Sequence, residues 1–94
     1  MRVIAFCPEW ELLASKCFEI VSRLRSLRVE VDVRDVPSLG DLKFLKIENG
    51  LVRLPQIVVV RNDHPVLVLG RDDIEHLSVE ELVRRIINLI SEVR

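Results

Sequence analysis

The chain has 94 residues, of which 49% are apolar and 31% are charged, so it can form one small domain with a modest core. Its 14 basic and 15 acidic side chains nearly balance, which argues against the basic surface of a nucleic-acid-binding protein. No apolar run approaches the ~20 residues of a membrane-spanning helix, and the N-terminus lacks a signal-peptide pattern. We therefore expect a single cytoplasmic domain over residues 1–94, with no nucleic-acid or membrane partner. Scarce amide side chains and abundant charges are compatible with a thermophilic source.

The N-terminal third predicts a strand followed at once by a long helix. Arg2–Phe6 is apolar after Arg2, which suits a strand in the interior of a sheet. Pro8 fits the first position of a helix, where its missing N–H is tolerated, so Cys7 is the expected N-cap. From Glu9 to Leu27, apolar residues recur at steps of three and four and predict an amphipathic helix. This apolar stripe consists of Trp10, Leu13, Ala14, Cys17, Ile20, Val21, Leu24 and Leu27.

The segment Arg28–Arg34 alternates apolar and charged residues, which predicts a half-buried strand at a sheet edge. Together with the first strand and helix it forms a βαβ unit, whose two strands should be parallel. The exposed edge at Val29–Val33 could also pair two copies of the chain into a homodimer.

The middle of the chain predicts a short helix and a hairpin. Asp41–Glu48 is expected to be helical and to end at Asn49-Gly50, a common C-cap pair. Gln56–Val60 and Val66–Leu69 are expected to be strands joined by a turn at 61–64, because Asn62-Asp63 supplies turn chemistry.

The C-terminal segment predicts a closing helix. Ser78 and Glu81 form a capping-box pattern, and Glu80/Arg84 and Glu81/Arg85 are spaced for ion pairs along one helix. The expected buried stripe is Val79, Leu82, Val83, Ile86, Ile90 and Val93. The whole order is β-α-β-α-β-β-α, an α/β domain with a four-stranded mixed sheet and helices on both faces.

This order, with Cys-Pro at the first strand-to-helix turn, resembles the thioredoxin fold and more closely the glutaredoxins. The stretch "FCPEW" is similar to the family's active-site turn, "RLPQIVV" to its cis-proline segment, and "VLGRDDIEHL" to its glycine-containing segment near the C-terminus. The resemblance implies that Cys7, followed by Pro8, is the nucleophilic thiol. It also implies that Pro55 is cis and that the backbone of Leu54 pairs with the substrate.

The resemblance further implies that Gly70, Arg71 and Asp72 line the place where a γ-glutamyl group of glutathione is held. Trp10 stands where the family's second cysteine would be. The implied activity is therefore thiol–disulfide exchange by a one-cysteine mechanism. Its substrates would be disulfides of proteins or small thiols, with no resident cofactor and with glutathione or another low-molecular-weight thiol for recycling.

Physical chemistry leaves alternatives open for the cysteines. At an N-cap, the Cys7 thiolate would be stabilised by free amides and the helix dipole, although Glu9 and Glu11 oppose this. Alternatively, Cys7 is an inert half-buried residue. On a helix from Pro8, Cys17 would lie about 15 Å from Cys7, beyond the ~7 Å Cα limit of a disulfide, so it is expected to be an unpaired core residue.

Other candidates also have two interpretations. Trp10 is either a hydrophobic anchor for substrate or a core aromatic of the stripe, and the core interpretation is favoured. Asp72 and Asp73 either bind an ammonium group or cap a helical turn after Gly70, and capping is favoured. The two histidines lack metal-ligand spacing with the cysteines, so no metal site is expected. The alternative function is a redox-inactive thioredoxin-fold module that binds a protein or peptide.

Overall fold

The computed structural model describes residues 1–92 and contains a four-stranded mixed sheet in the order β2-β1-β5-β6. Strand β1 (Arg2–Phe6) pairs in parallel with β2 (Val31–Arg34) and antiparallel with β5 (Gln56–Arg61). Strand β5 pairs antiparallel with β6 (His64–Leu69). The predicted α/β class and the four-stranded mixed sheet are therefore confirmed. Among the helices in residues 1–92, none has the length and apolarity to cross a membrane.

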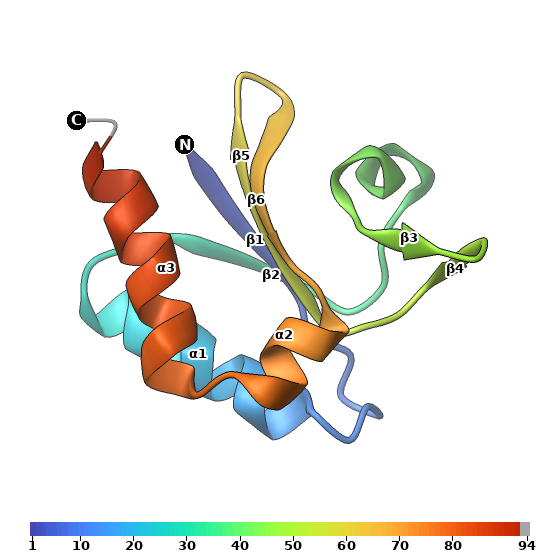
Figure 1. The fold of residues 1–94 in the computed structure, drawn as a ribbon, viewed down its shortest axis with the longest axis horizontal. Coiled ribbons are helices and arrows are strands. Elements are labelled where there is room, and N and C mark those ends of the chain that lie inside the picture. The colour runs from blue at the N-terminus through green and yellow to red at the C-terminus, as the bar shows by residue number, and fades with distance from the viewer. Residues whose placement is uncertain (93–94) are drawn as a thin grey trace.

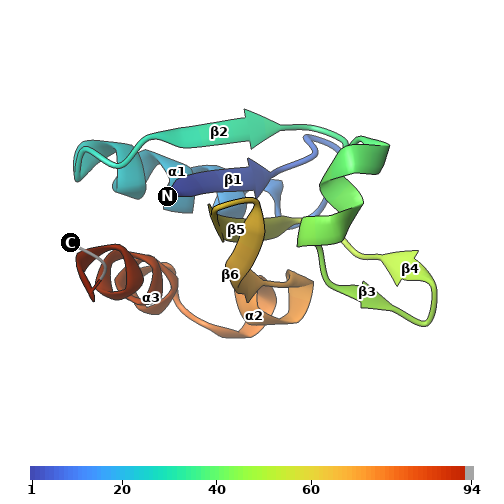
Figure 2. The same ribbon diagram turned by 90° about the horizontal axis from the view of Figure 1, so that it is seen from above.

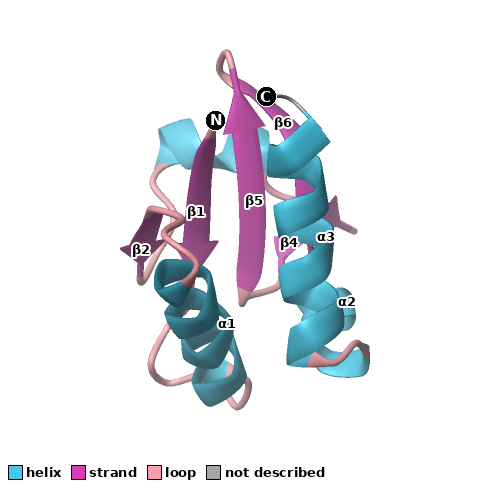
Figure 3. Cartoon of the chain, turned by 90° about the vertical axis from the view of Figure 1, so that its left-hand side faces the viewer, coloured by secondary structure: helices cyan, strands magenta, loops and turns pink. Residues whose placement is uncertain are grey.

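The two faces of the sheet are covered differently. Helices α1 (Ala14–Ser26) and α3 (Val79–Glu92) lie side by side on one face, which is the face toward the viewer in Figure 3. The other face is covered by a short 3-10 helix, η1 (Leu39–Phe44), and by the small hairpin that follows it (Figures 1 and 2). The expectation of helices on both faces is thus met by α-helices on one face and by a 3-10 helix on the other.

Alternation along β1 builds a core on each side of the sheet. Val3 and Ala5 belong to the larger cluster under α1 and α3, whereas Ile4 and Phe6 belong to a smaller cluster beneath η1. This division follows from the two-residue period of a strand. It also explains why the N-terminal strand is apolar after its first residue, because both of its faces are covered.

The predicted helix over Asp41–Glu48 is wrong. Its first part is the 3-10 helix η1, and its last residues form β3 (Ile47–Glu48), which pairs antiparallel with β4 (Leu51–Val52). Asn49 and Gly50, expected to end a helix, instead form the two-residue turn of this hairpin, with φ of 51° and 75°. Asn-Gly favours both structures because each needs a left-handed residue.

The predicted hairpin near the middle of the chain is confirmed. Asn62 and Asp63 have φ of 50° and 63° and connect β5 to β6, whose strands extend slightly further than expected. Helix α2 (Arg71–His76) begins after Gly70, whose N–H donates to the Asp73 carboxylate at 3.0 Å. The capping interpretation of Asp73 is therefore confirmed.

The closing helix α3 begins after Ser78, as predicted. The Ser78 Oγ accepts the N–H of Glu81 at 3.1 Å, which is one half of the expected capping box. The Glu81 carboxylate pairs with Arg85, as predicted, and also with Arg84, so the expected Glu80/Arg84 pair is replaced by Glu81/Arg84. Leu82, Val83 and Ile86 are buried, Val79 and Ile90 are partly buried, and Val93 lies outside the described residues.

Candidate functional site

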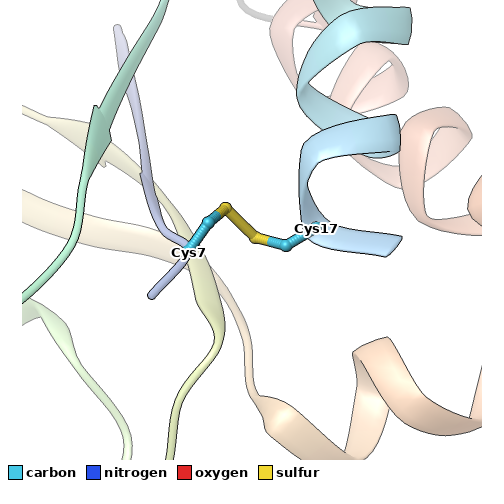
Figure 4. The surroundings of a disulfide bond; sticks show 2 residues. All are labelled: Cys7 and Cys17. Atoms are coloured by element: carbon cyan, nitrogen blue, oxygen red, sulfur yellow. A yellow bond between two sulfur atoms is a disulfide. The ribbon is translucent and has the colours of Figure 1, made fainter. Parts of the chain in front are cut away.

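The candidate site contains a disulfide bond between Cys7 and Cys17 (Figure 4). The Cα atoms of the two residues are 5.8 Å apart. The expected separation of about 15 Å, and the expectation that Cys17 is an unpaired core residue, are therefore wrong. The premise of a one-cysteine mechanism fails with them, because Cys7 has a partner thiol in the same chain.

The expected distance between the cysteines is too long because the first helix begins later than predicted. Helix α1 begins at Ala14, not after Cys7, and Cys17 lies in its first turn. A helix starting at Pro8 would separate the two cysteines by ten rises of ~1.5 Å, which is incompatible with the disulfide. The consequence is that Cys7 is not an N-cap, and the positive end of the helix dipole acts at Cys17 instead.

The residues between the cysteines form two successive turns in place of the predicted helix. The N–H of Glu11 donates to the Pro8 carbonyl at 3.1 Å, and the N–H of Ala14 donates to the Glu11 carbonyl at 3.1 Å. Leu13 precedes α1 without a side-chain hydrogen bond to the helix, and leucine is a poor N-cap. The local start signal at Pro8 is therefore overridden by the long-range bond between the sulfurs.

Cys7 lies beside Pro55, as the sequence predicts. Phe6 pairs with Gln56 in the antiparallel register of β1 and β5, and the next position of this register sets Cys7 opposite Pro55. On its other side, the Cys7 N–H donates to the Arg34 carbonyl of β2 at 2.9 Å. The Leu54–Pro55 peptide bond is cis, which confirms that prediction.

Arg71 connects three parts of this site. Its guanidinium donates to the Glu11 carboxylate at 2.9 Å and also to the Leu54 carbonyl, which precedes Pro55. The side chains of Arg71 and Glu11 are 19% and 28% exposed, so the ion pair is mostly shielded from water. Arg71 and Leu54 were predicted at the site, whereas Glu11 was predicted only to repel a thiolate. Its charge, opposite to that of Arg71, was the one signal that could have identified the pair.

The remaining residues expected near a γ-glutamyl group lie at the start of α2. Gly70 precedes the helix, and a Cβ there would meet the Lys46 side chain at 3.3 Å. Asp72 is half exposed and forms an ion pair with Arg53 at 3.5 Å. Asp72 therefore faces the segment before Leu54, where it already has a partner.

The loop between the cysteines also exposes apolar side chains. Trp10 is 68% exposed and Leu12 is 91% exposed, whereas Pro8 is buried. The favoured interpretation of Trp10 as a core aromatic is therefore wrong. The apolar period continues through Trp10, but the helix that would turn this side chain toward the core does not extend that far.

Gln56 is a supporting residue that the sequence analysis missed. Its side chain is buried and forms three hydrogen bonds, with the Lys46 N–H, the Lys46 carbonyl and the Arg53 carbonyl, at 2.9 to 3.0 Å. These bonds fix the ends of the β3–β4 segment next to Leu54 and Pro55. The sequence signal for this role was a single polar residue at the start of an otherwise apolar strand.

Both cysteines are fully buried within the larger apolar cluster, together with Ile74, Leu69 and Ile57. Within residues 1–92, no group of three His, Cys, Asp or Glu side chains is placed to hold a metal ion. The chemistry that the two paired cysteines can supply is the making and breaking of one sulfur–sulfur bond.

Comparisons with protein-family models, with curated proteins and with solved structures gave no match to this chain. The function is therefore argued from the site itself. Its defining features are a disulfide at the end of β1, a cis-proline opposite Cys7, and an arginine that joins the loop between the cysteines to the residue before that proline.

Proposed function

We propose that this chain is a thiol–disulfide oxidoreductase of the thioredoxin-like, glutaredoxin-like type that uses Cys7 and Cys17 as a reversible pair. The observation that carries the proposal is the position of the disulfide at the carboxyl end of β1, opposite Pro55. This position agrees with the active site that the "FCPEW" and "RLPQIVV" resemblance implies. The disulfide supports a mechanism with two cysteines in place of the expected one-cysteine mechanism.

The arrangement of the strands supports the fold part of the proposal. A parallel pair joined by a helical crossover is followed by an antiparallel hairpin, and the strand order is β2-β1-β5-β6. Helices α1 and α3 pack together on one face. These are the relationships expected of a thioredoxin-like domain from the order of elements in the sequence.

The reaction would proceed in two exchange steps. In the reduced protein, the Cys7 thiolate attacks one sulfur of a substrate disulfide, forms a mixed disulfide and releases the first substrate thiol. The Cys17 thiolate then attacks the Cys7 sulfur and releases the second substrate thiol. The protein thereby gains the disulfide seen here and transfers two electrons to the substrate. A low-molecular-weight thiol such as glutathione, or a dithiol, would return the protein to its reduced form.

The position of Cys17 favours its role as the second nucleophile. It lies in the first turn of α1, where the helix dipole favours a thiolate. The exposed side chains of Trp10 and Leu12 lie between the two cysteines and would contact a protein substrate. The substrate class that fits this surface is a disulfide flanked by apolar residues.

The burial of the cysteines favours a second candidate function. A disulfide with no exposed surface in an apolar core can serve as a structural bond. The chain would then be a redox-inactive module that binds a protein or peptide. The two candidates differ in whether the disulfide exchanges with outside thiols while the protein remains folded.

The test is a disulfide-exchange assay with the wild-type protein, Cys7→Ser and Cys17→Ser. The substrates are a mixed disulfide of glutathione and a small protein with a reducible disulfide, with glutathione or dithiothreitol as the electron donor. The oxidoreductase proposal expects turnover by the wild type, none by Cys7→Ser, and trapping of a mixed disulfide on Cys7 in Cys17→Ser. Equal, uncatalysed rates for all three proteins would establish the redox-inactive alternative.

A further inference from the structure

The two sulfurs that must react with an outside thiol are sealed from solvent. Cys7 and Cys17 both have 0% exposure. Residues 8–13, which we call the cover loop, lie between the two cysteines; Pro8 in this loop is buried, and Leu13 packs against the apolar cluster that contains Cys7 and Cys17. Attack on either sulfur needs a thiolate in line with the S–S bond, so side chains that bury the sulfurs must move before exchange can start, and the adjoining loop, with Trp10 and Leu12 exposed, is the segment that can do so with the least loss of packing.

The cover loop is held against the rest of the domain by the packing of Pro8 and Leu13 and by one polar side-chain contact. Its own turns use hydrogen bonds between Glu11 and Pro8 and between Ala14 and Glu11, which move with the loop. Among the hydrogen bonds and ion pairs of residues 1–92, the contact of Arg71 with Glu11 is the one that joins a side chain of the loop to another element. Arg71 is in turn fixed by the Leu54 carbonyl.

We propose that the Arg71–Glu11 ion pair is a latch that controls access to the Cys7–Cys17 disulfide. When the latch is closed, the loop covers the sulfurs and the disulfide does not exchange. When it opens, a thiolate reaches one sulfur. The proposal concerns regulation of the site described above and rests on the proposed function for its biological meaning, but its test does not require turnover.

When dithiothreitol is the reductant, reduction of the disulfide takes two thiol–disulfide exchange steps. One of its thiolates attacks a sulfur of the protein disulfide and displaces the other cysteine as a thiolate. Its second thiol then attacks the mixed disulfide and leaves as a cyclic disulfide. Two electrons and two protons pass to Cys7 and Cys17. If opening precedes the first attack, the rate rises linearly with dithiothreitol and then reaches a plateau set by the opening step.

The experiment measures the rate of reduction of the oxidised protein by dithiothreitol, followed by alkylation and mass. The test variant is Glu11→Gln, and the matched control is Glu9→Gln. Glu9 is exposed and has no ion-pair partner within the described residues. Both substitutions remove one negative charge from the same loop, so both change the approach of an anionic thiolate similarly. Only Glu11→Gln weakens the contact with Arg71.

We expect Glu11→Gln to be reduced about three- to tenfold faster than Glu9→Gln, the range for weakening one shielded, charge-assisted hydrogen bond. In an Arg71→Gln background, Glu11→Gln should give no acceleration beyond the one that Glu9→Gln gives in the same background, because the ion pair is already absent. The rates should depend only weakly on low concentrations of urea, because a local opening exposes little surface.

Equal rates for Glu11→Gln and Glu9→Gln would overturn the latch, as would additive effects in the double variant. A steep dependence of every rate on urea would also overturn it, because reduction would then need global unfolding. The latch proposal and the oxidoreductase proposal are tested by different measurements, so one can be rejected without the other. If Glu11→Gln is reduced faster than Glu9→Gln but no substrate is turned over, the latch is supported and the oxidoreductase is rejected. If substrate is turned over but the two variants are reduced at the same rate, the oxidoreductase is supported and the latch is rejected.

Discussion

The Cα atoms of Cys7 and Cys17 lie 5.8 Å apart, although one residue follows strand β1 and the other lies in the first turn of α1. The bond between them closes a loop at the carboxyl end of β1. It requires that α1 begin later than Pro8, and Glu11 in the same loop contacts Arg71, which also donates to the Leu54 carbonyl.

The first prediction concerns the contribution of this disulfide to stability. A sequence separation of 10 implies that reduction lowers the free energy of unfolding by about 2–3 kcal/mol, because the open chain gains conformational entropy when it unfolds. The melting midpoint should fall by on the order of 10 °C or more. Urea and thermal unfolding of oxidised and reduced protein measure this. Cys7→Ala/Cys17→Ala is the control, because it removes the bond without placing hydroxyl groups in the apolar cluster, and it should gain no stability from oxidising conditions. Coincident curves for the oxidised and reduced forms would contradict the prediction.

The second prediction concerns the pH dependence of stability through Asp41. Burial would raise the pKa of Asp41, but the Ser38 N–H and the Arg34 guanidinium outweigh burial and lower this pKa below its ordinary value of 3.8. Since the pKa is lower in the folded state, the carboxylate stabilises the fold above pH ~4. This stabilisation is lost as the pH falls through the folded-state pKa.

Asp41→Asn should therefore lower the free energy of unfolding at pH 7 by about 1.5–3 kcal/mol, and the difference from the wild type should shrink toward pH 3. Urea unfolding at several pH values measures both effects. Asp63→Asn is the matched control. Its partner Lys43 also lowers the pKa of Asp63, but the Asp63 side chain is 72% exposed, so this substitution should change stability little. An Asp41 effect that grows as the pH falls would show that the sign is wrong.

The third prediction concerns Gln56 as the support of the segment before Pro55. Gln56→Leu keeps a similar volume but removes three hydrogen bonds, which leaves the Lys46 and Arg53 backbone groups without these partners. We expect a loss of about 2–4 kcal/mol in the free energy of unfolding. We also expect faster amide exchange at Lys46, which hydrogen-exchange mass spectrometry would locate. Gln56→Glu keeps the acceptor for the Lys46 N–H but sets a buried carboxylate oxygen against the Lys46 and Arg53 carbonyls, so it should lose at least as much stability as Gln56→Leu. A Leu variant as stable as the wild type would reject this role.

The fourth prediction separates backbone conformation from packing at two glycines. A Cβ at Gly50 meets no atom within 4 Å, but its φ of +75° is strained for other residues. Gly50→Ala should therefore cost about 1 kcal/mol from backbone strain alone. Gly40→Ala is the control, because Gly40 has no positive φ and its Cβ would meet only the Ser38 side chain at 3.8 Å. Chemical denaturation should show Gly40→Ala within about 0.5 kcal/mol of the wild type, and equal losses for the two variants would refute the assignment.

The sequence by itself determined the elements that depend on short-range signals. The apolar run predicts β1, the Asn62-Asp63 pair predicts the β5–β6 turn, and Ser78 predicts the start of α3. Each signal acts within a few residues, through side-chain period, turn geometry or capping. The position of Pro55 opposite Cys7 follows from the register of β1 and β5, two strands that the apolar runs predict.

Only the tertiary structure decided the composition of the site. The pairing of Cys7 with Cys17 replaces a helical start at Pro8 that every local signal favours, because one covalent bond outweighs the weak propensities of six residues. The contact of Arg71 with Glu11 joins residues that are 60 positions apart. No period, cap or turn encodes such a contact, since it exists only after the sheet and α2 have brought the two segments together.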